Sequence, residues 1–375
     1  MSNYLRLPSP IRRMLARRLA RPAPPPTVQR TRRACIYKVD RLGDFVLALG
    51  AVRHLVNHYG ADACQLVVST VAEPLAAAEF PDVPRWVVPP TASGAWRELR
   101  PLRNVTAPLW AGEHFTDLIC LRHARNLYRD ASLTWLSAEH WRGLGPRCTP
   151  DELTLANRPV LPENYSSSAT LPWSHELLAH RAVVELATGR LPDWEEMRPA
   201  LRSVTANAGA AWVFCPFGHD AIRDYPIEHW ITAWRNAQLP PAPVQLLGPG
   251  TRAAELAQLA SRLRNEASAG PVEVLTGLST PQFIARIAAA RGVVTVDSAA
   301  AHLATALDKP AVIIMGGGHF GWFVPWGEGV KQRWLVHKLP CFGCNWECIH
   351  PEVRCLTELP AATVTAALRV AFAHG

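Results

Sequence analysis

The chain alternates short runs of β-branched and aliphatic residues with longer segments whose apolar residues have helical spacing. This alternation predicts parallel strands joined and covered by helices. In the first half it predicts strands at 35–39, 65–69, 85–88 and 117–121 and helices at 44–58 and 174–188. Residues 140–172 are rich in Pro, Ser and Asn and show no period, so we expect them to be irregular.

A second and more regular alternation begins at Trp212. It predicts strands at 212–215, 244–247, 272–275, 293–296 and 312–315, with helices at 226–237, 252–264, 281–290 and 300–307. Two of these helices have Pro at or near the first turn, where helix starts favour it. The two halves therefore predict two Rossmann-like α/β domains. Ligands of open parallel sheets bind beyond the carboxyl ends of the strands, so the loops that follow the strands are the candidate sites.

The composition is consistent with two folded domains. The chain has 375 residues, about twice the usual domain length of roughly 100 to 200 residues. Hydrophobic residues make up 49% and charged residues 19%, which excludes wholesale disorder. No stretch has the roughly 18 to 20 uncharged apolar residues of a membrane-spanning helix. We expect a basic extension at 1–33, domains at 34–205 and 206–340, and a Cys-rich knuckle with a C-terminal helix at 341–375.

The net charge of +8 is concentrated at the N-terminus. Residues 1–33 contain nine arginines and no acidic residue, so the rest of the chain is close to neutral, and a nucleic-acid-binding body is not expected. Apolar residues at helical spacing between Ile11 and Leu19 predict a basic amphipathic helix that lies on a membrane surface; a solvated extension is the alternative. An odd, clustered set of nine cysteines indicates a reducing compartment. We therefore expect a cytoplasmic protein with peripheral contact to a membrane surface.

Two strand-to-helix loops each contain a charged residue suited to group transfer. Asp44 follows Gly43 at a predicted helix start, where it either caps the helix or accepts a proton from an incoming hydroxyl. Arg223 lies in the loop 216–226, where it either pairs with a diphosphate or is an ordinary surface arginine.

The loop after the strand at 293–296 is the most distinctive. Ser298 is a good N-cap, and the three alanines after it leave the first helical turn bare. A phosphate could therefore reach free backbone N–H groups at the positive end of the helix dipole. Asp297 could orient a sugar hydroxyl. His302, one turn further, either donates to a ligand oxygen or makes a local structural bond.

Two further features follow the last predicted strand. The glycines at 316–318 either admit a ligand or form a turn, and they lack the spacing of a P-loop or a dinucleotide-binding motif. Four thiols lie within 15 residues, at Cys341, Cys344, Cys348 and Cys355. They predict a structural zinc or iron site, with two disulfides or free thiols as alternatives. Four thiolates complete a tetrahedral shell, so such a metal would not be catalytic.

With these loops in place, the sequence resembles the glycosyltransferase family 9 enzymes, the heptosyltransferase family. The resemblance covers residues 34 to about 370. It is carried by Arg-Leu-Gly-Asp at 41–44, the loop 218–226, Thr-Gly-Leu-Ser at 276–279 and, most specifically, Asp-Ser-Ala-Ala-Ala-His-Leu-Ala at 297–304. The cysteines and the stretch 316–320 are similar to a subgroup with a four-cysteine metal site. The resemblance implies an α/β GT-B fold, two Rossmann-like domains with a cleft between them, and inverting transfer without a catalytic metal.

The resemblance also implies roles for individual residues. Asp44 matches the catalytic base, and Arg223 falls where the family usually has lysine. Gly218 and His219 fall at phosphate-contacting positions, Leu278 matches a residue that packs on the base, and Glu255 matches a ribose-binding acid. The other implied donor-binding residues are Asp297, Ser298, Ala299, His302, Gly316 and Gly317. Ala299 replaces the usual glycine, and its methyl group narrows the approach of the diphosphate; Tyr225 replaces a common tryptophan.

The implied reaction is transfer of a heptose from a nucleotide diphosphate donor, with ADP-heptose favoured. The implied acceptor is a hydroxyl of a cell-envelope glycan, the lipopolysaccharide core, a lipid-linked acceptor or a protein. A nucleotide-sugar epimerase and a non-catalytic assembly factor that retains the fold are the alternatives. Product analysis separates the epimerase from the transferase, and assays of wild type and Asp44→Ala separate an enzyme from an assembly factor.

Overall fold

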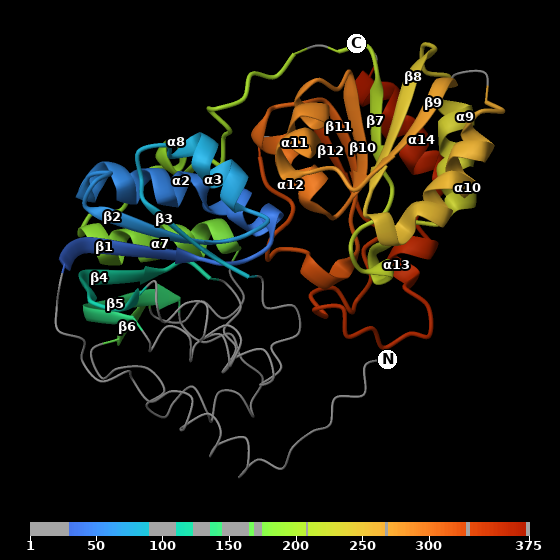
Figure 1. The fold of residues 1–375 in the computed structure, drawn as a ribbon. Coiled ribbons are helices and arrows are strands. Elements are labelled where there is room, and N and C mark those ends of the chain that lie inside the picture. The colour runs from blue at the N-terminus through green and yellow to red at the C-terminus, as the bar shows by residue number, and fades with distance from the viewer. Residues whose placement is uncertain are drawn as a thin grey trace. The chain divides into compact units, whose positions relative to one another are not determined.

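The computed structural model describes residues 30–89, 110–122, 136–144, 165–168, 175–207, 209–266, 269–327 and 331–372. The chain divides into two compact units (Figure 1). The first contains Met1–Arg41 and Ala48–Arg198, and the second contains Leu42–Leu47 and Pro199–Gly375. The predicted amphipathic helix in the basic extension lies outside the described residues. No helix in the described ranges is long and apolar enough to cross a membrane.

The first unit is built on a six-stranded parallel sheet with the order β3-β2-β1-β4-β5-β6. Its strands are β1 (Arg30–Lys38), β2 (Cys64–Ser69), β3 (Arg85–Val88), β4 (Glu113–Cys120), β5 (Ser137–Leu144) and β6 (Tyr165–Ser168). β1 therefore includes the last arginines of the predicted basic extension. This strand order is the Rossmann order, in which the winding of the chain reverses between β1 and β4.

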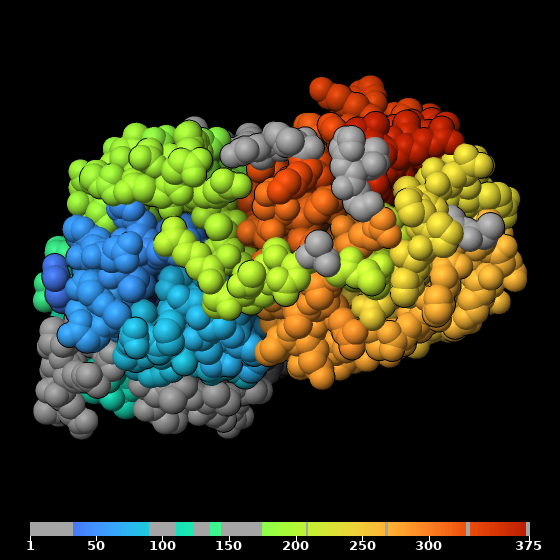
Figure 2. Space-filling view, turned by 90° about the horizontal axis from the view of Figure 1, so that it is seen from above, coloured from blue at the N-terminus to red at the C-terminus, as the bar shows by residue number. Residues whose placement is uncertain are grey.

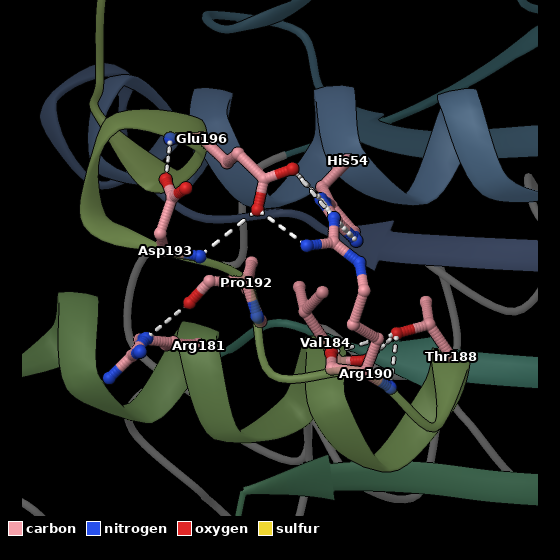
Figure 3. Close-up of polar contacts among 8 residues, drawn as sticks. All are labelled: His54, Arg181, Val184, Thr188, Arg190, Pro192, Asp193 and Glu196. Atoms are coloured by element: carbon pink, nitrogen blue, oxygen red, sulfur yellow. Dashed lines mark hydrogen bonds and ion pairs between the residues drawn. The ribbon is translucent and has the colours of Figure 1, made fainter.

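Four helices accompany this sheet: α2 (Leu42–Tyr59), α3 (Glu73–Glu79), α7 (Glu176–Thr188) and α8 (Trp194–Met197). The turn between α7 and α8 is fixed by polar contacts, which Figure 3 shows. Asp193 and Glu196 form a capping box at the start of α8. Arg190 pairs with Glu196 at 2.6 Å and contacts the ring of His54, in α2, at 3.3 Å. These contacts tie the α7–α8 turn to α2.

The prediction that residues 140–172 are irregular is wrong for two stretches, because β5 runs to Leu144 and β6 lies within this segment. β5 has no β-branched residue, so its sequence does not indicate a strand. Pairing with β4 holds it in place, together with burial of Trp141 and an ion pair of 2.7 Å between Arg142 Nε and Asp117 Oδ1. Tertiary contacts thus override the local preference.

The second unit has a six-stranded parallel sheet with the order β12-β11-β10-β7-β8-β9. Its strands are β7 (Trp212–Cys215), β8 (Ala242–Gly248), β9 (Ala269–Thr276), β10 (Gly292–Val296), β11 (Ala311–Ile314) and β12 (Gln332–Leu335). The sequence predicts the first five but not β12. Counted within the unit, this is again the Rossmann order, and the winding reverses between β7 and β10.

Helices cover this second sheet: α9 (Ile227–Ala237), α10 (Ala253–Leu263), α11 (Thr280–Ala288), α12 (Ala299–Ala306), α13 (Arg354–Thr357) and α14 (Ala361–Phe372). Short 3₁₀ turns lie at η1 (Ala221–Arg223), η2 (Gly250–Arg252) and η3 (Gly317–His319). α14, red in Figure 2, lies at the surface of the unit and packs against α9. In the core, Phe214 of β7 packs edge-on against Trp230 and stacks on Trp234. This core fixes the strands whose carboxyl ends carry the candidate site.

Gly50 lies in α2 where that helix meets α8, and a Cβ there would overlap the carbonyl oxygen of Met197. We expect Gly50→Ala to lower the free energy of unfolding by about 1–3 kcal/mol, because the overlap outweighs the gain in helix propensity. Gly250 has open space around its Cβ position, so Gly250→Ala is the matched control and is expected to change stability by less than about 0.5 kcal/mol. Urea unfolding followed by circular dichroism measures both, and equal stability of the two variants would contradict the prediction.

Candidate functional site

A buried carboxylate, Asp297, forms the centre of a charged cluster in the second unit. Its side chain is only 3% exposed and directly follows β10. Its Oδ2 lies 3.4 Å from Nδ1 of His319 and 3.8 Å from Nη1 of Arg223. Arg223 follows β7 and His319 follows β11, so three adjacent parallel strands bring the three side chains to one edge of the sheet. This edge includes the point between β7 and β10 where the winding reverses and where such sheets bind ligands.

The surroundings of Asp297 keep its carboxylate ionised. Burial alone would raise the pKa, but the polar contact with His319 and the positive charge of Arg223 outweigh burial and lower the pKa to about 2. Asp297 is therefore an anion at neutral pH, and it balances the positive charge of Arg223 beside it.

The half-buried side chain of Arg223 makes only long contacts with the carboxylates around it. Its distances to the carboxylates of Asp297 and Asp220 are 3.8 and 3.9 Å, well beyond the roughly 2.7–2.9 Å of a strong charge-assisted hydrogen bond. Its Nη1 also donates to the backbone oxygen of Asp297 at 3.4 Å. Its Nε is buried and has no hydrogen-bond partner among the described residues. The guanidinium thus retains donor capacity for an anionic ligand.

The first turn of α12 lies next to this cluster in the chain and is less bare than the sequence predicts. Ser298 is the N-cap, as predicted, and its side chain accepts from the N–H of Ala300 at 3.3 Å. The N–H groups of Ala301 and His302 bond to the carbonyl of Ser298. Within the described ranges, Ala299 supplies the one N–H of this turn with no protein partner. The N-terminus of α12 can therefore bind an anion through one backbone N–H group and the positive end of the helix dipole.

His302 makes the local bond that the sequence left as an alternative. Its Nδ1 accepts a hydrogen bond from Nε1 of Trp326 at 2.9 Å, and the two rings stack. Because Nδ1 accepts, the neutral ring carries its hydrogen on Nε2. A ligand-binding role for His302 stays a prediction and would have to use that second nitrogen.

Asp44 lies in the first turn of α2, whose residues Leu42–Leu47 group with the second unit. Helix α2 begins at Leu42, so Asp44 is inside the first turn and is not the N-cap. A Cβ on Gly43 would come within 2.8 Å of Cδ2 of His302 and 3.5 Å of Cα of Ala299. Glycine is thus needed at position 43, because the start of α2 approaches the start of α12.

The predicted ribose-binding acid belongs to a network that sequence reasoning did not identify. Glu255 Oε1 accepts from Nε of Arg252 at 2.8 Å, and Nη2 of Arg252 donates to Oδ2 of Asp224 at 2.5 Å. The guanidinium of Arg252 also lies 4.5 Å from the ring centroid of Phe217. Burial raises the pKa of Asp224 despite its bond to Arg252. Asp224 follows β7 and Arg252 follows β8. Their positions after the carboxyl ends of strands could have identified them as candidate site residues from the sequence.

Three other predicted donor residues lie in loops at the same edge of the sheet. Gly218 and His219 follow β7, and Leu278 lies between β9 and α11. His219 is exposed, Leu278 is half-buried, and a Cβ on Gly218 would be 3.7 Å from Cδ of Arg223, an ordinary contact. Their roles in ligand binding stay predictions.

Packing accounts for the glycines that follow β11. A Cβ on Gly316 would come within 2.6 Å of Trp346, and a Cβ on Gly318 would overlap the same indole. A Cβ on Gly317 would come within 2.6 Å of Phe342. Aromatic rings from the Cys-rich segment therefore lie directly on this loop. Donor-binding roles for Gly316 and Gly317 stay predictions, since these contacts already require glycine there.

The four clustered cysteines line one pocket, together with residues of the glycine loop. They are free thiols, which excludes the two local disulfides in this structure. Burial and the neighbouring thiols raise the pKa of Cys355, whose Sγ accepts from the N–H of Gly317 at 3.4 Å. Four thiols match zinc or iron chemically, but no group of three or more His, Cys, Asp or Glu side chains in the described ranges is arranged to hold a metal ion. The metal at Cys341, Cys344, Cys348 and Cys355 stays a prediction.

The low pKa of Asp297 predicts a pH-dependent contribution to stability. The folded pKa, about 2, lies below the ordinary value of 3.8, so the stabilisation is present above about pH 4 and is lost as the pH falls towards about 2. We expect wild type to lose about 2 kcal/mol more unfolding free energy over this range than Asp297→Asn. Urea unfolding at a series of pH values measures this difference, with exposed Asp82→Asn as control. Parallel pH profiles for wild type and Asp297→Asn would show that the carboxylate is not stabilised as described.

Comparisons with known proteins place this site in a family. Residues 123–350, more than half of the chain, match the family model of glycosyltransferase family 9 (heptosyltransferase). No curated protein matches the chain.

Among solved structures, the chain is similar to E. coli heptosyltransferase WaaC, solved with ADP and with ADP-2-deoxy-2-fluoro heptose. The sequences are 19% identical, the TM-score is 0.63, and the match covers 89% of this chain and 98% of WaaC. A family 9 glycosyltransferase of Veillonella parvula is 13% identical with a TM-score of 0.66 (92% and 98% covered). E. coli ADP-heptose lipopolysaccharide heptosyltransferase II is 16% identical with a TM-score of 0.60 (91% and 98% covered). These likenesses confirm the GT-B fold. The chain belongs to glycosyltransferase family 9, the heptosyltransferase family, and is a glycosyltransferase.

Proposed function

We propose that this enzyme transfers a heptose from ADP-heptose, with inversion at the anomeric carbon, to a hydroxyl of a cell-envelope glycan, the lipopolysaccharide core or a protein. The observation that carries the proposal is the loosely held guanidinium of Arg223 at the point where the winding of the second sheet reverses. In a member of the heptosyltransferase family, this is the place for a nucleotide diphosphate. The structures of E. coli WaaC with ADP and with ADP-2-deoxy-2-fluoro heptose support the choice of nucleotide.

On the donor side, Arg223 and the N–H of Ala299 bind the diphosphate. As the bond between the anomeric carbon and the phosphate oxygen breaks, negative charge builds on that oxygen. The planar guanidinium and the positive end of α12 stabilise this charge as it develops. Asp297 keeps Arg223 near this position without using all its donors.

On the acceptor side, Asp44 is the base. The acceptor oxygen attacks the anomeric carbon, its proton passes to the carboxylate of Asp44, and ADP leaves with the electron pair of the broken bond. A single displacement of this kind inverts the anomeric centre. Gly43, which has no side chain, allows the turn that carries Asp44 to approach α12.

The proposal includes a cellular location. The arginines of residues 1–33 suit contact with anionic lipids on the cytoplasmic face of the inner membrane, where the acceptor would be presented.

A thermal-shift screen of ADP-heptose, GDP-sugars and UDP-sugars tests the donor. A ligand that binds only the folded chain stabilises it by about 2.7 kcal/mol at about 100 times its Kd, so ADP-heptose is expected to raise the Tm most. Arg223→Ala should show a smaller shift with the same ligand. A larger shift with a GDP- or UDP-sugar would contradict the choice of ADP-heptose.

Replacement of the proposed base tests the chemical step. We expect Asp44→Asn to lower kcat for transfer from ADP-heptose by about 10²- to 10⁴-fold, because the amide cannot accept the proton. Its affinity for ADP, measured by calorimetry, should stay within about twofold of wild type, since the nucleotide does not need the base. The exposed Asp62→Asn is the control for a lost surface charge. Full activity in Asp44→Asn would remove this residue from the base role.

A further inference from the structure

The Cys-rich segment places one aromatic side chain, Trp346, against the cluster around Asp297. Arg223 Cζ lies 5.5 Å from the centroid of the indole, within the range of a cation–π contact. The ring of His319 stands edge-on to the same indole, with centroids 5.7 Å apart and planes at 76°. Trp346 therefore contacts both Arg223 and His319, the two side chains beside the buried carboxylate.

The backbone at Trp346 has a conformation that a bulky residue rarely adopts. Its φ is 63°, and that of Asn345 before it is 50°, so two consecutive non-glycine residues are left-handed. Such residues persist only where the surrounding structure determines them, and they are concentrated at functional sites. The backbone thus tolerates strain in order to present this indole.

The glycine loop after β11 is the surface on which the indole lies. Gly316 and Gly318 leave no room for a Cβ beneath the ring. Hydrogen bonds from the N–H of Gly343 to the carbonyl of Gly317, at 2.8 Å, and from Asn345 to Gly318, at 3.1 Å, hold the Cys-rich segment to this loop. Packing on the glycines and the two backbone hydrogen bonds therefore fix the position of the indole.

The indole N–H gives no alternative reason for this placement. Nε1 of Trp346 is buried and has no hydrogen-bond partner among the described residues. A buried donor without a partner is unfavourable, so hydrogen bonding does not explain the placement of the ring. The ring instead packs on Gly316 and Gly318 and contacts Arg223 and His319.

We propose that Trp346 is a positioning residue of the donor site, which acts by holding the guanidinium of Arg223 where the donor diphosphate binds. This inference rests on the proposed function. Trp346 lies between Cys344 and Cys348, so the Cys-rich segment supplies a wall of the donor site in addition to any role of its thiols.

A double-mutant cycle with ADP as the probe tests the inference on the full chain. Calorimetry measures ADP affinity for wild type, Trp346→Leu, Arg223→Ala and the double variant. Trp346→Leu is expected to weaken ADP binding about fivefold to tenfold, the loss of a partly desolvated cation–π contact. In the Arg223→Ala background the same substitution should have less than about a twofold effect, because its target is gone. Trp346→Phe retains an aromatic face and should recover most of the affinity.

Binding of adenosine, measured in the same way, distinguishes a positioning role of Trp346 from a general disruption of the site. Adenosine lacks the diphosphate, so its affinity should be the same in wild type and Trp346→Leu, whereas a collapsed site would bind both ligands poorly. Trp194→Leu is the matched control. Cζ of Arg181 lies 4.7 Å from the centroid of the Trp194 ring, in the first unit, and loss of this indole should leave ADP binding unchanged.

Two outcomes would overturn the positioning role: ADP affinity unchanged in Trp346→Leu, or an equal loss in the presence and absence of Arg223. If Trp346→Leu does not fold, as judged by circular dichroism, the cycle is run with Trp346→Phe, whose smaller ring should give a loss of about twofold to threefold that again depends on Arg223. A wild-type chain that binds no ADP would contradict the proposed donor and, with it, this inference. If wild type and Trp346→Leu bind ADP equally well, only the role of Trp346 is contradicted, and the proposed donor stands.

Discussion

The pairing of the buried, ionised carboxylate of Asp297 with its neighbours is the interaction on which the proposed donor site depends. A charge at this depth is unfavourable unless opposite charges compensate it. The charge of Arg223 and the polar contact with His319 provide that compensation from loops that follow the strands on either side, so it exists only when the sheet has its observed order. At 3.8 Å the pairing with Arg223 is loose enough to leave the guanidinium donors available for an anion. The same interaction thus stabilises the fold and leaves Arg223 able to bind an anionic ligand.

The first unit has a related pair at the equivalent point of its own sheet, but there the two charged groups lie closer together. Asp40 follows β1 and Arg122 follows β4, and Arg122 Nε lies 3.0 Å from Asp40 Oδ1 with the arginine only 1% exposed. Burial would raise the pKa of Asp40, but Arg122 and Lys38 outweigh it and lower the pKa to about 2. Nζ of Lys38 also bonds to Glu176 at 2.5 Å. This network fixes the chain just before Asp44, whereas the looser pair of the second unit suits a ligand.

The sequence predicted the parts of the structure that depend on local pattern. The alternation of strands and helices, the Ser298 cap and the placement of Asp297 and Arg223 in strand-to-helix loops all follow from hydrophobic period and turn chemistry. It did not predict β5, whose pairing rather than composition makes it a strand, or the contact between His319 and Asp297. The sequence left the glycines after β11 as either a ligand loop or a turn, because it does not show that Trp346 lies on them. Each of these features depends on contacts between residues that are distant in the chain, which local sequence patterns do not reveal.

A crystal structure of the full chain with bound ADP tests the central claim most directly. The account predicts that the β-phosphate lies within hydrogen-bond distance of the Arg223 guanidinium and the N–H of Ala299, with the adenine near Leu278 and the carboxylate of Asp297 still facing His319. Electron density for ADP away from the carboxyl edge of the second sheet, or an Arg223 that makes no phosphate contact, would contradict it.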